Sequence, residues 1–147
     1  MNQPRYQLKA NEDQTVYEFL SEGPRGKIVK IIQFTTTNYK DVFNLAFGDL
    51  NGKSGKIDDK VISNNRDSEI VLATVVSAIY AFTEKYPDAW IYATGSTKPR
   101  TRLYRMGITK YLKDVKSDFD IFGQVAKTWK KFTKGVEYES FLVKRKK

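Results

Sequence analysis

Alternating apolar and polar positions dominate the first third of the chain. In one such run Tyr17 and Phe19 fall on the same face, and the next run is apolar on nearly both faces. The composition of Glu22 to Gly26 is typical of a turn, and similar polar stretches separate the other runs. This pattern predicts an antiparallel meander with short accessory strands. The predicted strands cover residues 6–8, 15–21, 27–36, 42–47 and 61–62.

A helical period replaces the alternation after residue 66. Asp67 or Ser68 can cap the helix, and Pro87 closes the segment. The apolar residues recur at intervals of three and four, which predicts one long helix packed against the sheet. These residues are Leu72, Val75, Val76, Ile79 and Phe82.

The next stretch reads as a strand, a turn and a helix. Residues 90–93 form a short apolar run, which predicts a strand buried on both faces. Ser96 or Thr97 can cap the following helix, Pro99 is tolerated in its first turn, and Gly107 is expected to end it. A second short helix is expected to begin at Thr109.

The last third contains two further predicted strands, at 119–125 and 138–143, with a basic loop at 127–135 between them. Together these elements predict an α+β fold. We expect a curved antiparallel sheet of about five to seven strands, with one long and one or two short helices packed on one side. The chain is expected to form a single domain over residues 1–143, followed by a basic C-terminal tail at 144–147.

Composition narrows the chemistry. The 147 residues are 40% hydrophobic, enough for one buried core, and neither a membrane-spanning run nor a secretory signal is apparent. We therefore expect a cytoplasmic protein without a membrane association. The chain lacks cysteine and histidine, which excludes thiol and histidine-based catalysis and the usual zinc ligands. The polar loop at 48–59 departs from both the P-loop and the calcium-loop patterns. We expect no metal and no cofactor.

Charge is unevenly distributed along the chain. Residues 1–97 carry 11 basic and 12 acidic side chains, whereas residues 98–147 carry 15 basic and 5 acidic ones. The net charge of +9 therefore arises in the last third, and such a field attracts polyanions. The alternative is that the lysines only keep the protein soluble and that the end of the chain is a frayed tail.

The turn at 95–97 is the strongest candidate for a site. A strand, a small-residue turn and a helix start direct backbone amides toward one point, with the positive end of the helix dipole behind them. Basic side chains surround this turn, and a tryptophan lies among the lysines of the later basic loop, as single-stranded nucleic acid requires. The same residues can instead be an ordinary connection and a solvated face. The candidate residues are Ser96, Thr97, Arg100, Arg102, Arg105, Lys127, Trp129, Lys130 and Lys131.

Four segments carry a resemblance to a known family. They are YEFLSEGPRGKI (residues 17–28), NLAFGD (44–49), VISNN (61–65) and ATGSTKPRTRLYRMGI (93–108). With these segments the chain resembles a family of short bacterial domains of unknown function. The resemblance spans nearly the whole chain and implies one domain, without implying an activity.

A second likeness concerns the helix, strand and helix that end in RLYRMGI at 102–108. This succession resembles the second half of acyl-CoA-dependent N-acetyltransferases, and the resemblance implies that Tyr104 acts as a general acid. The pattern departs from that family at 63–67, where Asp67 stands in place of a glycine-rich turn that holds the pyrophosphate.

Three functions remain open from the sequence. The leading expectation is a non-enzymatic module that binds nucleic acid or another phosphate-bearing partner through the basic residues named above. The second is a module that recognises a protein, and the third is an acyl-CoA-dependent enzyme.

Overall fold

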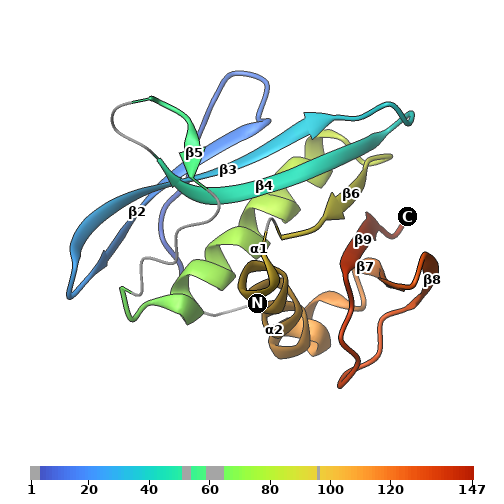
Figure 1. Ribbon diagram of the computed structural model, residues 1–147. Helices are drawn as coiled ribbons and strands as arrows, with labels where there is room; N and C mark the ends of the chain where they lie inside the picture. The colour runs from blue at the N-terminus through green and yellow to red at the C-terminus, as the bar shows by residue number, and fades with distance from the viewer. Residues whose placement is uncertain (1–3, 51–53, 59–64, 96) are drawn as a thin grey trace.

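A computed structural model describes residues 4–50, 54–58, 65–95 and 97–147 of the protein. The fold is α+β, as predicted, but its sheet has more strands than expected, since nine occur within the described residues. Eight of them follow the order β1-β2-β3-β4-β6-β9-β7-β8, and β5 pairs with β4 (Figure 1). The strands are β1 (Lys9–Ala10), β2 (Val16–Gly23), β3 (Gly26–Thr36), β4 (Val42–Leu50), β5 (Ile57–Asp58), β6 (Trp90–Ala93), β7 (Phe119–Val125), β8 (Thr128–Lys131) and β9 (Ser140–Arg145).

The meander predicted from the alternating residues is present as β2, β3 and β4. These strands pair antiparallel, with Tyr17 opposite Ile32 and Phe34 opposite Leu45. All four of these side chains are buried on the same side of the sheet. The accessory strand expected at 6–8 lies at β1 instead, and the strand expected at 61–62 falls outside the described residues.

The sheet is mixed rather than purely antiparallel. Strand β6 pairs parallel with β4 and antiparallel with β9. Helix α1 (Ser68–Lys85) carries the chain across the sheet between β4 and β6, and such a crossover is what a parallel neighbour requires. Alternation in β6 also differs from the prediction. Only Ile91 and Ala93 are buried, whereas Trp90 and Tyr92 are partly exposed on the other face.

Both helices pack on one side of the sheet, where the core lies (Figure 1). The ring of Phe82 in α1 stacks on Phe34 of β3 with 4.1 Å between centroids. Helix α2 (Lys98–Val115) buries Tyr104 and Tyr111 against the same core. Within the described ranges, no helix is both long enough and apolar enough to cross a membrane.

Helix α2 is one continuous helix of 18 residues, so the predicted end at Gly107 and the second short helix from Thr109 were wrong. Gly107 lies within it and faces α1. A Cβ atom at this position would lie 2.9 Å from Cδ2 of Leu72. The glycine therefore marks a close approach of two helices, which a single sequence cannot distinguish from a helix end.

The prediction of a loop at 127–135 was also wrong in part, because residues 128–131 form strand β8, which pairs with β7. Ala126 and Lys127 connect the two strands, and both have positive φ, 49° and 66°. Two such residues form the tight turn that suits a β-hairpin, normally with Asn and Gly. Since neither residue type occurs here, local sequence rules do not predict the hairpin. Strand β9 extends to Arg145, two residues into the predicted tail.

Candidate anion-binding cleft

The start of α2 is built as its residues predict. Thr97 is the N-cap, and its side-chain oxygen accepts a hydrogen bond from the amide of Arg100. The amide of Gly95 donates to Oγ1 of Thr101 at 3.0 Å, which ties the end of β6 to the first turn of the helix. A Cβ atom at Gly95 would lie 2.3 Å from the amide nitrogen of Thr101, so only glycine permits this approach. Ser96 lies outside the described residues.

A cleft of about 460 Å³ opens beside this turn, between the start of α2 and the segment that leads into β9. Lys98, Arg102 and Arg105 line it from the helix. They are spaced by four and three residues and therefore share one helical face. On the opposite wall, Thr94 donates a hydrogen bond to the backbone oxygen of Glu139. The remaining lining residues are Gly95, Thr97, Thr101, Glu137 and Tyr138.

Among the described residues, one long ion pair joins the charges that line the cleft. Nη1 of Arg105 lies 3.8 Å from Oε1 of Glu137, a carboxylate that is 82% exposed. Such an exposed pair contributes little to stability and is easily rearranged. Arg102 is exposed. Three cations thus face two carboxylates across an open space.

The backbone adds to the positive field. The first turn of α2 contains no acidic residue, and it begins with Lys98. Cations near a helix N-terminus are disfavoured by the helix dipole, by about 0.3–1 kcal/mol each. An anion bound in the cleft would relieve this repulsion.

Of the predicted arginines, Arg102 and Arg105 share the cleft with Thr97, whereas Arg100 does not line it. Arg100 is only 4% exposed, and its guanidinium lies 5.0 Å from the ring centroid of Phe47. The spacing explains this separation, because Arg100 lies on a different face of the helix from Arg102. Lys98, which was not among the predicted residues, lines the cleft in its place.

The predicted residues of the later segment do not line the cleft. Lys127, Trp129, Lys130 and Lys131 are exposed on the β7–β8 hairpin. Phe132, which follows them, packs on Tyr138 and Phe141 and belongs to the core.

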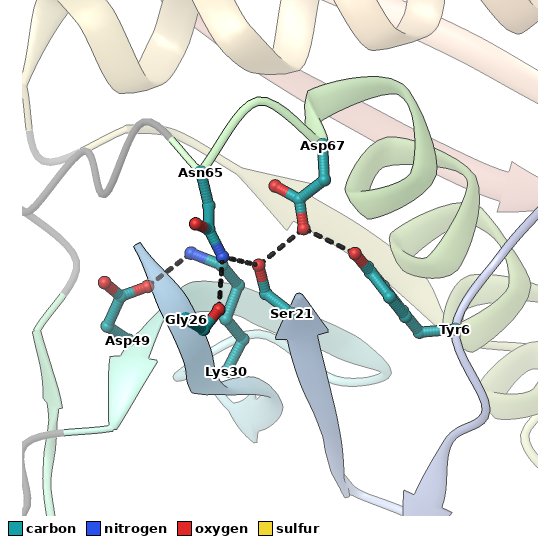
Figure 2. A network of polar contacts seen from close by, with 7 residues as sticks. All are labelled: Tyr6, Ser21, Gly26, Lys30, Asp49, Asn65 and Asp67. Carbon is teal, nitrogen blue, oxygen red and sulfur yellow. Dashed lines mark hydrogen bonds and ion pairs between the residues drawn. The ribbon is translucent and has the colours of Figure 1, made fainter. Parts of the chain in front are cut away.

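A buried polar network, which the sequence did not predict, connects the segment before α1 to the β2–β3 hairpin. Figure 2 shows Asp67 accepting hydrogen bonds from Ser21 and Tyr6, at 2.5 Å and 2.7 Å. The amide group of Asn65 donates to Oγ of Ser21 and to the backbone oxygen of Gly26. Burial raises the pKa of Tyr6, and its hydrogen bond to Asp67 acts in the same direction. The network fixes the start of α1 on the sheet.

The carboxylate of Asp67 therefore does not act as the predicted helix cap. Asp67 occupies the N-cap position, but its side chain makes no hydrogen bond to the helix amides. Its oxygen is already used by Ser21 and Tyr6. The carboxylate still places a negative charge beside the N-terminus of α1.

A buried ion pair lies in the same part of the molecule. Nζ of Lys30 donates to Oδ1 of Asp49 at 2.5 Å, and the two side chains are 6% and 13% exposed (Figure 2). Lys30 also lies 5.8 Å from the ring of Phe47, which Arg100 contacts as well. The four segments that carry the family resemblance thus supply Ser21, Asp49, Asn65 and Arg100 to neighbouring buried contacts. The family resemblance of those segments was the one signal in the sequence that indicated these buried contacts.

The described part of the chain contains no cluster of three or more Asp, Glu, His or Cys side chains that could hold a metal ion. A second, apolar cavity of about 70 Å³ lies between the helices and the sheet. Tyr104 and Gly107 line it together with Phe141. It is too small for more than a few atoms.

Comparison with known proteins gives a family and no further relative. Residues 2–146 match the model of a family of unknown function, DUF6934. The chain belongs to this family, in agreement with the resemblance found in the sequence. No curated protein and no solved structure matches the chain.

Proposed function

We propose that this member of DUF6934 is a binding module that holds a phosphate-bearing ligand in the cleft at the start of α2. The observation that carries the proposal is the face formed by Lys98, Arg102 and Arg105 over a space of about 460 Å³. These cations lie at the N-terminal end of a helix whose first turn has no acidic residue. Guanidinium groups, the dipole and the open volume all favour a phosphate.

The volume and the lining of the cleft also restrict the size of the ligand and the hydrogen-bonding groups that it carries besides phosphate. A volume of this size is within the range of small-molecule sites, so a nucleotide unit fits more readily than a bare ion. Glu137 and Glu139 face the cations and can accept hydrogen bonds from amino groups. A nucleotide supplies both a phosphate and exocyclic amines. The expected partner is therefore nucleic acid or another nucleotide-bearing ligand.

An acyl-CoA-dependent enzyme is the second candidate. The succession on which that likeness rests is present as α1, β6 and α2. Tyr104, the suggested general acid, is 9% exposed and lines the apolar cavity rather than the cleft. Because coenzyme A also carries phosphates, the cleft suits it as well, and the test below includes it.

A thermal-shift titration with single-stranded DNA, RNA and acetyl-CoA, at low and moderate salt, tests the proposal. A ligand that binds only the folded state must raise its melting temperature. We expect the oligonucleotides to raise it, and the shift to decrease with salt because counterions compete for the cations. A shift with acetyl-CoA alone would favour the enzyme. No shift with any of them would leave a protein partner as the better hypothesis.

The double variant Arg102→Gln and Arg105→Gln tests the site itself. Charge-assisted hydrogen bonds contribute about 1.5–3 kcal/mol each, so affinity should fall by about 100-fold or more. Lys113 and Lys116 provide the matched control, because both are exposed near the opposite end of α2. Their double glutamine variant removes the same charge and should retain binding. Equal losses in both variants would show a diffuse charge effect and no cleft.

A further inference from the structure

The side of the sheet that faces away from the helices carries an aromatic surface. In β6 the buried residues Ile91 and Ala93 face the helices, so Trp90 and Tyr92 point to the other side. The register places Leu142 opposite Tyr92, and Phe122 opposite Leu142. We call this surface the aromatic face. It consists of Trp90, Tyr92, Phe122, Trp129 and Leu142.

The rings of the aromatic face contact each other across the strands. Tyr92 and Trp129 lie 6.2 Å apart, edge to face, and Trp90 lies 6.0 Å from Phe122. The hydroxyl of Tyr92 is 3.0 Å from that of Ser140, which is buried. Trp129 nevertheless remains 37% exposed. A large apolar ring with this exposure, next to other aromatics, is a surface on which a further ring can stack.

Lysines flank these rings, and Asp120 lies opposite Lys144 in the register. Nζ of Lys144 lies 5.6 Å from the ring centroid of Trp90. Lys131 follows Trp129 by two positions in β8 and so projects to the same side, and Lys127 occupies the tip of the hairpin. The last third of the chain, which contains this face, carries 15 basic and 5 acidic side chains. Two copies of such a surface repel each other, whereas a polyanion is attracted.

The aromatic face adjoins the anion-binding cleft. Thr94 and Glu139 line the cleft and are joined by a hydrogen bond. Tyr92 precedes Thr94 by two residues, and its contact Ser140 directly follows Glu139. A chain whose phosphate lies in the cleft can therefore continue onto Tyr92 and Trp129. Figure 1 shows β7, β8 and β9 together at this end of the sheet.

We infer that the aromatic face binds single-stranded nucleic acid by stacking bases on Trp129 and its neighbours while the cleft and the lysines hold the backbone. This inference rests on the proposed function and specifies its ligand. Bases in a duplex have both faces covered, so only unpaired bases can stack on a protein ring. The surface contributes ring contacts and charge, which predicts weak dependence on base sequence.

Tryptophan fluorescence provides a direct test, because both tryptophans of the chain, Trp90 and Trp129, belong to the aromatic face. The probe is a thymidine oligonucleotide of about 12 nucleotides, with its RNA counterpart and a duplex of equal length as further arms. We expect quenching on titration with either single strand, at least tenfold higher affinity for single strand than for duplex, and weaker binding at higher salt. Quenching by the duplex at equal affinity would overturn the inference.

Substitution at Trp129 separates stacking from charge. Trp129→Ala should weaken binding about tenfold, as expected for one lost base contact, and Trp90 remains as the reporter. Trp129→Phe keeps a ring and should retain most of the affinity. Full affinity in Trp129→Ala would overturn the inference. So would sedimentation showing that the wild-type protein self-associates and that this variant is monomeric, since a second copy would then occupy the face.

The two proposals fail in distinguishable ways. If the cleft does not bind phosphate, Arg102→Gln with Arg105→Gln will leave both affinity and quenching intact. If bases do not stack on the aromatic face, that variant will weaken binding while wild-type fluorescence stays unchanged at saturation. Loss of affinity in both sets of variants, with quenching in the wild type, is the result that supports both.

Discussion

The two helices have equal length but carry side chains of opposite charge at their N-terminal ends. Helix α1 begins beside the carboxylate of Asp67 and carries Glu69 in its first turn. Helix α2 begins beside Thr97, has no acid in its first turn, and presents Lys98. The first end lies beside the protein's own anions, whereas the second lies beside an open cleft.

The surroundings of the polar side chains differ in the same way. Around α1, Ser21, Asn65 and Asp67 are buried, and each hydrogen-bonds within the network. Around α2, Arg102 is exposed, and the ion pair that Arg105 forms among the described residues is a long one, to Glu137. Buried, mutually bonded polar groups hold a fold together, whereas exposed, weakly paired ones are available to a ligand. Whether polar residues at a helix start stabilise the fold or bind a ligand can therefore be judged only once their burial is known.

Replacing Asp67 should produce the largest effect. Asp67→Ala leaves the buried hydroxyl of Ser21 without this acceptor and removes the negative charge beside α1, and we expect a loss of about 3 kcal/mol in the free energy of unfolding. Urea denaturation measures it. Glu69→Ala is the control, because that carboxylate is 75% exposed and should cost less than about 1 kcal/mol. Equal losses would contradict a special role of the buried network.

Neighbouring arginines of α2 should respond differently. Arg100→Gln removes a buried cation beside Phe47, and we expect a loss of about 2 kcal/mol. Arg102→Gln, at an exposed position, should change stability by less than about 0.5 kcal/mol and should weaken oligonucleotide binding instead. Denaturation and fluorescence titration of both variants measure the two effects. A strong binding defect in Arg100→Gln, with unchanged stability, would place that residue in the site.

Two tyrosines of the N-terminal half form a matched pair. Tyr6→Phe removes the hydrogen bond to Asp67 and should lower stability by about 1 kcal/mol. The hydroxyl of Tyr17 is buried and has no hydrogen-bond partner within the described residues. Tyr17→Phe should therefore leave stability unchanged or raise it slightly. Parallel thermal melts distinguish the two cases, and a larger loss in Tyr17→Phe would be the contrary result.

Alkaline pH should act through the buried tyrosines, of which Tyr17 is one and Tyr80 another. Burial raises the pKa of Tyr17 from 10.0 to about 12. Above pH 10 the unfolded state loses this proton while the folded state keeps it, so stability falls as pH rises toward 12. In Tyr17→Phe this part of the decline should be absent. Melting temperatures from pH 9 upward compare the two proteins, and identical slopes would contradict the assignment.

Supplying α2 with its own anion should change stability only slightly. Lys98→Glu places a carboxylate at the first position of the helix and should stabilise it by about 0.5 kcal/mol. The same change should sharply reduce phosphate binding, because the new charge competes with the ligand. Lys98→Gln is the control for the loss of the lysine alone. Unchanged oligonucleotide affinity in Lys98→Glu would exclude the cleft as the binding site.

Local patterns predicted much of the fold. Alternation at Tyr17 and Phe19 located β2, helical spacing located α1, and Thr97 with Pro99 located the start of α2. Each of these signals is contained within a few consecutive residues. The β7–β8 hairpin was not predicted, because its turn contains no glycine. The continuity of α2 was not predicted either, because Gly107 lies inside the helix and does not end it.

Local patterns predicted the α+β class and the position of the turn before α2, and composition located the excess of positive charge in the last third. The folded structure sets the surroundings of each of these charges. It buried Arg100, exposed Arg102, joined Ser21 to Asp67 across 46 positions of sequence, and turned Trp90 and Tyr92 away from the core. The physical reason is that burial and partnership depend on residues distant along the chain, which local periodicity does not encode.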